Sequence, residues 1–135
     1  MPEGSFSLRH RRKVLIVDCD ADYLISLERY FEEGGFDTTT TWDACEAIAL
    51  LASRQFNALL VGEHPPEAKS EEILRGLRRS VPCIVLQAAM RHPFEAQYLS
   101  FLGAYAVVPK QNIKDVMEKV HQSLKNSHGV SAGAA

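Results

Sequence analysis

Short apolar runs alternate with amphipathic segments along this chain, and the alternation constrains the fold more than any other feature of the sequence. Residues 14–17 form a continuous apolar run that ends at Asp18, which is typical of a strand buried on both faces of a sheet. The next segment, 21–33, has apolar residues three and four positions apart and ends before Gly34 and Gly35, which predicts a helix. The patterned part of the chain therefore begins with a strand followed by a helix.

The same alternation of strand and helix continues through the sequence. Further strands are predicted at 36–41, 58–61, 83–86 and 105–108, and further helices after Asp43 and at 67–79, 94–102 and 113–124. Five strands alternating with five helices predict right-handed crossovers and a parallel sheet covered on both faces. For a chain of this size we expect a doubly wound α/β domain, (βα)5, with the flavodoxin-like strand order 2-1-3-4-5.

The second helix is expected to begin after Asp43, whose short carboxylate side chain is a favoured N-cap. Its inner face is predicted from the helical spacing of its apolar residues. That face comprises Ala44, Ala47, Ile48 and Leu51.

The composition favours one soluble domain. The chain has 135 residues, and we expect a flexible basic lead over 1–12, one domain over 13–126 and a disordered tail over 127–135. Fifteen basic against seventeen acidic residues leave no basic excess for a long nucleic-acid contact. No apolar run approaches the ~20 residues that span a bilayer, and no signal peptide is recognisable, so we expect a cytoplasmic protein.

The three cysteines are odd in number and lack the close pairing of a zinc site, so they are expected to be reduced thiols. Cys83 is predicted in a strand core and Cys45 on a helix face. Cys19 precedes a helix, whose N-terminus lowers a thiol pKa, but its acidic neighbours have the opposite effect; we expect it partly buried and inert. The five histidines show no metal-ligand spacing, so neither a metal nor a cofactor is expected.

Candidate functional residues follow the strands, because ligands of such sheets bind outside the carboxyl ends of the strands. These residues are Asp18, Cys19 and Asp20 after the first strand, Gly62 and Glu63 after the third, Gln87 after the fourth and Lys110 after the fifth.

Four of these strand segments, at family spacing, are similar to those of a known family. They are Lys-Val-Leu-Ile-Val-Asp-Cys-Asp at 13–20, Phe-Asn-Ala-Leu-Leu-Val-Gly-Glu at 56–63, Val-Pro-Cys-Ile-Val-Leu-Gln-Ala at 81–88 and Gly-Ala-Tyr-Ala-Val-Val-Pro-Lys at 103–110. Over 13–125 the chain resembles the receiver domain of bacterial response regulators, the CheY-like superfamily. The resemblance implies phosphoryl transfer from a histidine kinase to an aspartate that ends the third strand. It also implies a magnesium ion near two adjacent acids, a lysine that pairs with the phosphate and a switch hydroxyl.

This sequence departs from the family pattern at several of those positions. The nucleophile position falls on Gly62, the second acid on Cys19 and the switch hydroxyl on Gln87, whereas Asp18 and Lys110 match the family. A thiol suits magnesium poorly. We therefore expect Lys110 to pair with Asp18, and the site to be a vestigial phosphorylation pocket.

Two other acids lie near this pocket. Asp20 follows the first strand, and Glu63 follows Gly62 but would point to the opposite face unless the loop bends. We expect phosphorylation at neither of them.

The resulting hypothesis is a pseudo-receiver without enzymatic activity, which acts as a phosphorylation-independent protein-interaction module in signal transduction or transcriptional regulation. The resemblance implies a surface built from the fourth helix, fifth strand and fifth helix, and here we expect a protein partner or a second copy to bind. Neither nucleic acid nor a membrane is expected as a direct partner. The candidate surface residues are Phe94, Tyr98, Tyr105, Val107 and Lys114.

The alternative hypothesis is a small-ligand or redox sensor. Loss of a carboxylate at Gly62 would leave room in the pocket, and Cys19 would line it. An active flavodoxin-like enzyme finds no support, because neither a nucleophile with an adjacent base nor a glycine-rich phosphate loop is visible.

Overall fold

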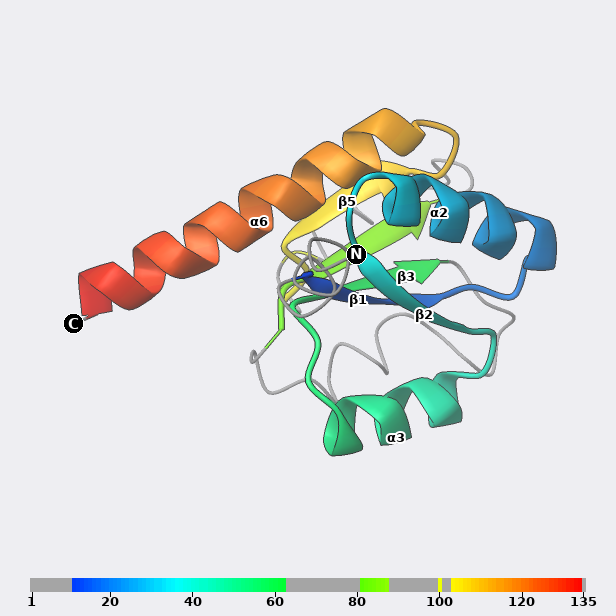
Figure 1. Cartoon of the computed structure of the whole chain (residues 1–135), viewed down its shortest axis with the longest axis horizontal. Coiled ribbons are helices and arrows are strands. Elements are labelled where there is room, and N and C mark those ends of the chain that lie inside the picture. Colours follow the sequence, from blue (N-terminus) through cyan, green and yellow to red (C-terminus); the bar gives the residue numbers. More distant parts are fainter. Residues whose placement is uncertain (1–10, 63–80, 88–99, 101–102, 135) are drawn as a thin grey trace, which may run out of the picture.

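A parallel five-stranded sheet forms the centre of the molecule (Figure 1). The computed structural model describes residues 11–62, 81–87, 100 and 103–134. The strand order is β2-β1-β3-β4-β5, which confirms the predicted doubly wound topology. The strands are β1 (Lys13–Val17), β2 (Asp37–Thr41), β3 (Ala58–Gly62), β4 (Cys83–Gln87) and β5 (Ala106–Pro109).

Helices lie on both faces of this sheet. Helices α2 (Ala21–Glu33) and α6 (Ile113–Ala134) cover one face, and α3 (Ala44–Ser53) covers the other (Figure 1). The helices predicted at 67–79 and 94–102 lie outside the described residues, so the expected number of helices remains a prediction.

Capping residues fix where the first two of these helices begin. The Asp20 carboxylate accepts a hydrogen bond from the backbone N–H of Tyr23 at 3.2 Å, and the Asp43 carboxylate accepts one from Cys45 at 2.9 Å. Each bond satisfies a backbone donor that has no partner within the helix. The second of these caps confirms the helix start predicted at Asp43.

The core consists of two apolar layers, one on each side of the sheet. Val14 and Ile16 of β1 pack toward α2 and α6, whereas Leu15 and Val17 pack toward α3. This alternation follows from the period of two residues in a strand. Strands β1 and β3 are apolar on both faces because both faces are covered.

The inner face of α3 differs from the prediction at one position. Ala47 is buried as expected, but Ile48 is 43% exposed, and Leu50 packs against the core instead. Successive helical residues are rotated by about 100°, so Leu50 lies about 60° from the direction of Ala47 while Ile48 lies about 100° from it. The prediction for Ile48 was therefore wrong.

The backbone of α6 continues to Ala134, through most of the segment expected to be a disordered tail. This segment contains alanine, the residue with the highest helix propensity, at 132 and 134, and two glycines, each about 1 kcal/mol less favourable in a helix. The division of the chain into lead, domain and tail remains a prediction.

The three cysteines form no disulfide with one another. Cys83 is buried as predicted, and burial raises the pKa of its thiol to about 12. Cys45 is exposed, and so is Cys19, contrary to the expectation of a partly buried thiol. Cys19 lies in the bend that follows β1, beyond the part of the strand that is covered on both faces.

The buried thiol predicts a loss of stability at alkaline pH. The unfolded chain ionises Cys83 near pH 9, whereas the folded protein keeps it protonated to about pH 12. The stability that the protonated Cys83 thiol contributes is therefore fully present below pH 9. Between pH 9 and about pH 12 the free energy of unfolding falls by about 1.4 kcal/mol per pH unit. Urea unfolding between pH 8 and pH 10 should show a steeper decline for the native chain than for Cys83→Ala.

The exposed Cys45 provides the matched control for this titration. The Cys45→Ala variant should follow the native pH profile. Parallel profiles for the native chain and Cys83→Ala would contradict the prediction.

Candidate functional site

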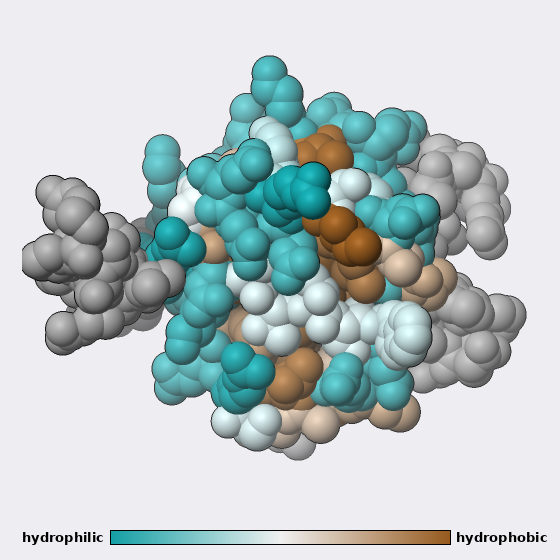
Figure 2. Space-filling model, turned by 45° about the vertical axis from the view of Figure 1, so that its right-hand side comes forward, coloured by the Kyte–Doolittle hydropathy of each residue, from teal (hydrophilic) through white to brown (hydrophobic). Residues whose placement is uncertain are grey.

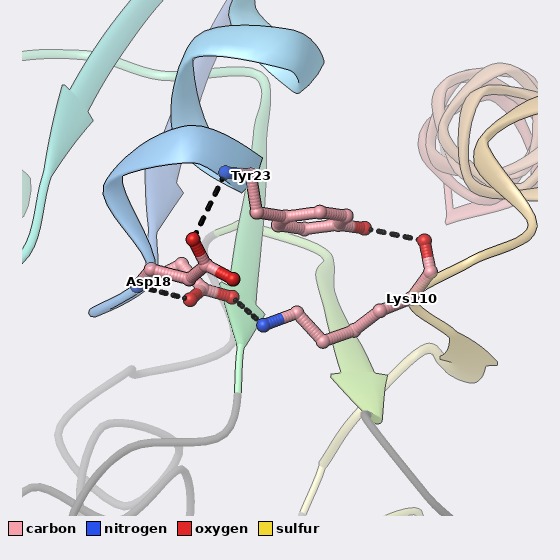
Figure 3. A network of polar contacts seen from close by, with 4 residues as sticks. Asp18, Tyr23 and Lys110 are labelled. Atoms are coloured by element: carbon pink, nitrogen blue, oxygen red, sulfur yellow. Dashed lines mark hydrogen bonds and ion pairs between the residues drawn. The ribbon is translucent and has the colours of Figure 1, made fainter.

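The carboxylate of Asp18, directly after β1, is the centre of the candidate site (Figure 3). Its side chain is fully buried. Oδ1 accepts a hydrogen bond from the backbone N–H of Asp20 at 2.8 Å, and Oδ2 lies 2.7 Å from Nζ of Lys110. Both carboxylate oxygens are therefore engaged within the protein, and the predicted pairing of Asp18 with Lys110 is confirmed.

This ion pair crosses the carboxyl edge of the sheet. Asp18 follows β1 and Lys110 follows β5, with β3 and β4 between them in the strand order. β5 is the third strand from β1, and neighbouring strands lie ~4.8 Å apart, so ~14 Å would separate the two strands in a flat sheet. The Lys110 side chain must therefore extend toward the middle of the sheet to reach Asp18. The Lys110 side chain is only 14% exposed, so the pair links the two strand ends away from bulk water.

Tyr23 of α2 contacts both the backbone and the side chain of Lys110 (Figure 3). Its hydroxyl donates a hydrogen bond to the backbone carbonyl of Lys110 at 2.8 Å, and its ring centroid lies 4.5 Å from Nζ. The ammonium is therefore shared between a carboxylate and an aromatic face. Burial, and secondly the negative charge of Asp18, raise the pKa of the Tyr23 hydroxyl well above its ordinary value, so it remains a donor.

Tyr23 was not predicted as a residue of the site. The available signal was its position three residues after the Asp20 cap, which fixes its place in the first turn of α2. No local pattern connects it with a lysine 87 residues further along the chain.

Gly62 lies beside Asp18, because the β1–β3 register pairs Val17 with Val61. A Cβ atom built on Gly62 would overlap Oδ2 of Asp18 and lie 2.5 Å from its Cγ. The Asp18 carboxylate therefore occupies the space that any side chain at position 62 would need. The expectation of an emptied pocket at Gly62 is wrong, since an inward-turned carboxylate fills that space.

Of the remaining predicted site residues, Asp20 is exposed and caps α2. The backbone of Gln87 ends β4, in register with Pro109, and its side chain lies outside the described part of the chain, as does Glu63. The structure thus brings together Asp18, Gly62 and Lys110 from three separate strand ends.

The described residues of the site do not fit a magnesium ion, which prefers oxygen ligands. Both oxygens of Asp18 are engaged, and the adjacent Cys19 offers an exposed thiol in place of a second carboxylate. Among the described residues there is no group of three or more His, Cys, Asp or Glu side chains that could hold a metal ion.

The predicted interaction surface is described in part. Tyr105 accepts a hydrogen bond from the side-chain amide of Asn126 at 2.5 Å, Val107 is half-buried, and Lys114 is exposed on α6. Phe94 and Tyr98 lie outside the described residues. No described helix is both long enough and apolar enough to cross a membrane.

Sequence comparison relates the chain to response regulators, although no family model matches it. It is 32% identical over 100 residues to the response regulator SaeR of Staphylococcus aureus, a match that covers 72% of this chain and 43% of SaeR. It is 33% identical over 79 residues to the transcriptional regulatory protein PrrA of Mycobacterium tuberculosis, covering 56% of this chain and 34% of PrrA. The chain therefore spans less than half the length of these curated relatives.

Solved structures show the same relationship at the level of the fold. The receiver domain of the Francisella response regulator 1452 superposes with a TM-score of 0.80 at 24% identity, covering 87% of this chain and 99% of that domain. A response regulator from Burkholderia pseudomallei with a phosphorylated aspartic acid, calcium ion and citrate gives 0.74 at 17% identity, covering 90% and 73%. The chain has the fold of a response-regulator receiver domain.

The buried ion pair predicts a large loss of stability when the lysine is removed. In Lys110→Met the carboxylate of Asp18 stays buried without its cation. Breaking a buried pair on one side costs about 3–5 kcal/mol in the free energy of unfolding, which urea denaturation measures.

Lys114→Met is the matched control, because Lys114 is exposed on α6. Its free energy of unfolding should stay within about 0.5 kcal/mol of the native value. If Lys110→Met lowered the free energy of unfolding no more than Lys114→Met does, Lys110 would act only as a surface charge and the prediction would be contradicted.

Proposed function

We propose that this receiver-type domain is a pseudo-receiver: a non-enzymatic protein-interaction module that works in signal transduction or transcriptional regulation without phosphorylation. One observation carries the proposal. Position 62 is a glycine, and the neighbouring carboxylate of Asp18 fills the space of its missing side chain while paired with Lys110.

Aspartyl phosphorylation requires a carboxylate nucleophile and cations that neutralise the incoming phosphoryl group. Gly62 has no nucleophile to offer. Lys110, which by resemblance would pair with the phosphate, is already neutralised by Asp18 at 2.7 Å. The charges of Asp18 and Lys110 therefore neutralise each other without a phosphate.

A displaced acceptor finds little support in the local structure. Among the described residues, Asp20 is an acid beside the pocket, and its carboxylate caps α2 through the backbone N–H of Tyr23. The Asp20 carboxylate is thus already used within the protein as a helix cap. We therefore include Asp20 in the vestigial pocket as a structural residue.

The relatives support a place in two-component signalling. SaeR is a response regulator and PrrA a transcriptional regulatory protein. The Burkholderia neighbour contains a phosphorylated aspartic acid, whereas position 62 of this chain is a glycine. Retention of the receiver fold without the acceptor side chain favours a role that depends on the surface of the domain.

We assign the partner-binding role to the surface around β5 and the start of α6, where Tyr105, Val107 and Lys114 lie. The partner is a signalling protein of the cytoplasm. We expect the domain to bind neither nucleic acid nor a membrane directly. The near-neutral charge of the chain, -2, agrees with a protein partner.

A sensor that uses an emptied pocket is the weaker alternative. Its premise was free space at Gly62, and the Asp18 carboxylate occupies that space. Cys19, which was expected to line the pocket, is exposed.

The experiment is incubation of the full chain with acetyl phosphate and magnesium, followed by intact mass measurement. A receiver domain that retains the acceptor aspartate, treated in parallel, shows that the donor is active. We expect no phosphoryl adduct on this chain. A stoichiometric adduct of one phosphoryl group would overturn the proposal.

A further inference from the structure

The turn between β5 and α6 is joined to other elements through Lys110. Strand β5 ends at Pro109 and α6 begins at Ile113, so three residues make the turn. Gln111 and Asn112 are exposed, whereas the side chain of Lys110 is only 14% exposed. Lys110 is therefore the residue through which this turn contacts the interior of the protein.

Two residues hold Lys110, and they fix different parts of it. The ion pair with Asp18, at 2.7 Å, fixes the ammonium at the end of a flexible four-carbon side chain. The hydroxyl of Tyr23 donates instead to the backbone carbonyl of Lys110, at 2.8 Å, and the Tyr23 ring lies 4.5 Å from Nζ. The flexible side chain lets the main chain shift while the ion pair persists, so the Tyr23 hydroxyl is the group that holds the main chain of Lys110.

The main chain of this turn leads directly into the cap of α6. Asn112 is the N-cap, because its side-chain Oδ1 accepts a hydrogen bond from the backbone N–H of Asp115 at 3.3 Å. Its backbone carbonyl accepts the first bond of the helix, from the N–H of Val116, at 3.1 Å. The bond from Tyr23 to Lys110 therefore holds the main chain two residues before the cap of α6.

Tyr23 is itself placed by the cap of α2. Its backbone N–H donates to the carboxylate of Asp20 at 3.2 Å, and the N–H of Asp20 donates to the carboxylate of Asp18 at 2.8 Å. Because Asp18 also pairs with Lys110, the contacts close on themselves (Figure 3). The resulting contact cycle, Asp18–Asp20–Tyr23–Lys110, joins the start of α2 to the turn that precedes α6.

We propose that the contact cycle makes the start of α2 and the start of α6 open and close as one unit, with Tyr23 as the positioning residue that links them. Native proteins open locally in cooperative units, and hydrogen bonds within a network strengthen one another. Breaking one contact of the cycle therefore weakens the others. Loosening of either helix start reaches the other through Tyr23.

The consequence concerns the surface at the start of α6. Gln111, Asn112 and Lys114 are exposed there, and all three are polar. In Figure 2 the upper part of the molecule, the height at which α2 and α6 lie in Figure 1, is mostly hydrophilic. Polar contacts are directional, so a partner that binds at Lys114 requires a fixed helix start. This consequence rests on the proposed function, whereas the joint opening of the two helix starts does not.

The test is amide hydrogen exchange of the full chain, followed by NMR under conditions where the rate reports the opening equilibrium. Tyr23→Phe keeps the ring but loses the hydroxyl bond to Lys110, and one such bond changes an equilibrium by about 2- to 10-fold. The amides of Asp115 and Val116 should exchange faster by this factor, whereas the amide of Ala47 in α3 should keep its native rate. Unchanged exchange at α6, or the same acceleration in α3, would overturn the proposal.

Tyr30 provides the matched control, because it lies about two turns further along α2 and outside the contact cycle. Tyr30→Phe removes a hydroxyl from the same helix and should leave the exchange of Asp115 and Val116 at the native rate. Equal acceleration in Tyr23→Phe and Tyr30→Phe would show that the stability of α2 in general is responsible, and would contradict the proposal.

A second pair of variants tests the link in the direction from α2 to α6. Asp20→Ala removes the cap of α2, and Asp43→Ala removes the equivalent cap of α3; both residues are exposed. Only Asp20→Ala should speed the exchange of Asp115 and Val116. Asp20→Asn keeps an oxygen acceptor and should show the native rate. Native exchange of α6 in Asp20→Ala would overturn the link through Tyr23.

These measurements use neither a phosphodonor nor a partner, so their outcome is separate from that of the acetyl phosphate experiment. A phosphoryl adduct would overturn the proposed function and leave the contact cycle in place. Independent exchange of the two helix starts would overturn the inference and leave the proposed function in place.

Discussion

The arrangement of the site depends on one buried carboxylate. Asp18 is fully buried, and a charge removed from water in this way requires a partner of opposite sign. Lys110 supplies that partner from the far side of the sheet, and the backbone N–H of Asp20 supplies a hydrogen bond. The strand order of the sheet matters to the site because it determines which strand ends these two groups must bridge.

The neighbours of the ion pair follow from the same constraint. The carboxylate lies where a Cβ of residue 62 would be, so glycine is the residue that leaves it room. The Tyr23 ring covers the lysine, and its hydroxyl holds the Lys110 backbone. The receiver fold is thus retained, while at its carboxyl edge Asp18, Lys110 and Tyr23 engage one another.

The fold was predictable from sequence because periodicity reports burial. Strands β1 and β3 are continuous apolar runs, and their parallel pairing in the centre of the sheet follows from that pattern. The outer face of α3 was less predictable: assigning Ile48 required the orientation of a short helix relative to the sheet, which apolar spacing alone does not specify.

The contacts of the site were predictable from the sequence where the charges of the residues alone determine the pairing. The pairing of Asp18 with Lys110 followed from two opposite charges at one sheet edge with no acceptor between them. Tyr23 and the filled space at Gly62 required three-dimensional positions, because each depends on where a side chain from another element lies. The exposure of Cys19 depends similarly on how the backbone bends after β1.

The central claim is that the Asp18 carboxylate takes the place of a side chain at position 62. A double-mutant cycle with Gly62→Ala and Asp18→Ala, measured as free energies of unfolding in urea, tests it most directly. Gly62→Ala should cost about 1–3 kcal/mol in the native background, because its methyl group overlaps the carboxylate. In the Asp18→Ala background the same substitution should cost at least about 1 kcal/mol less, since the carboxylate atoms that overlap the methyl group are gone and the Cβ of residue 18 lies 3.2 Å away. An equal cost in both backgrounds would contradict the account.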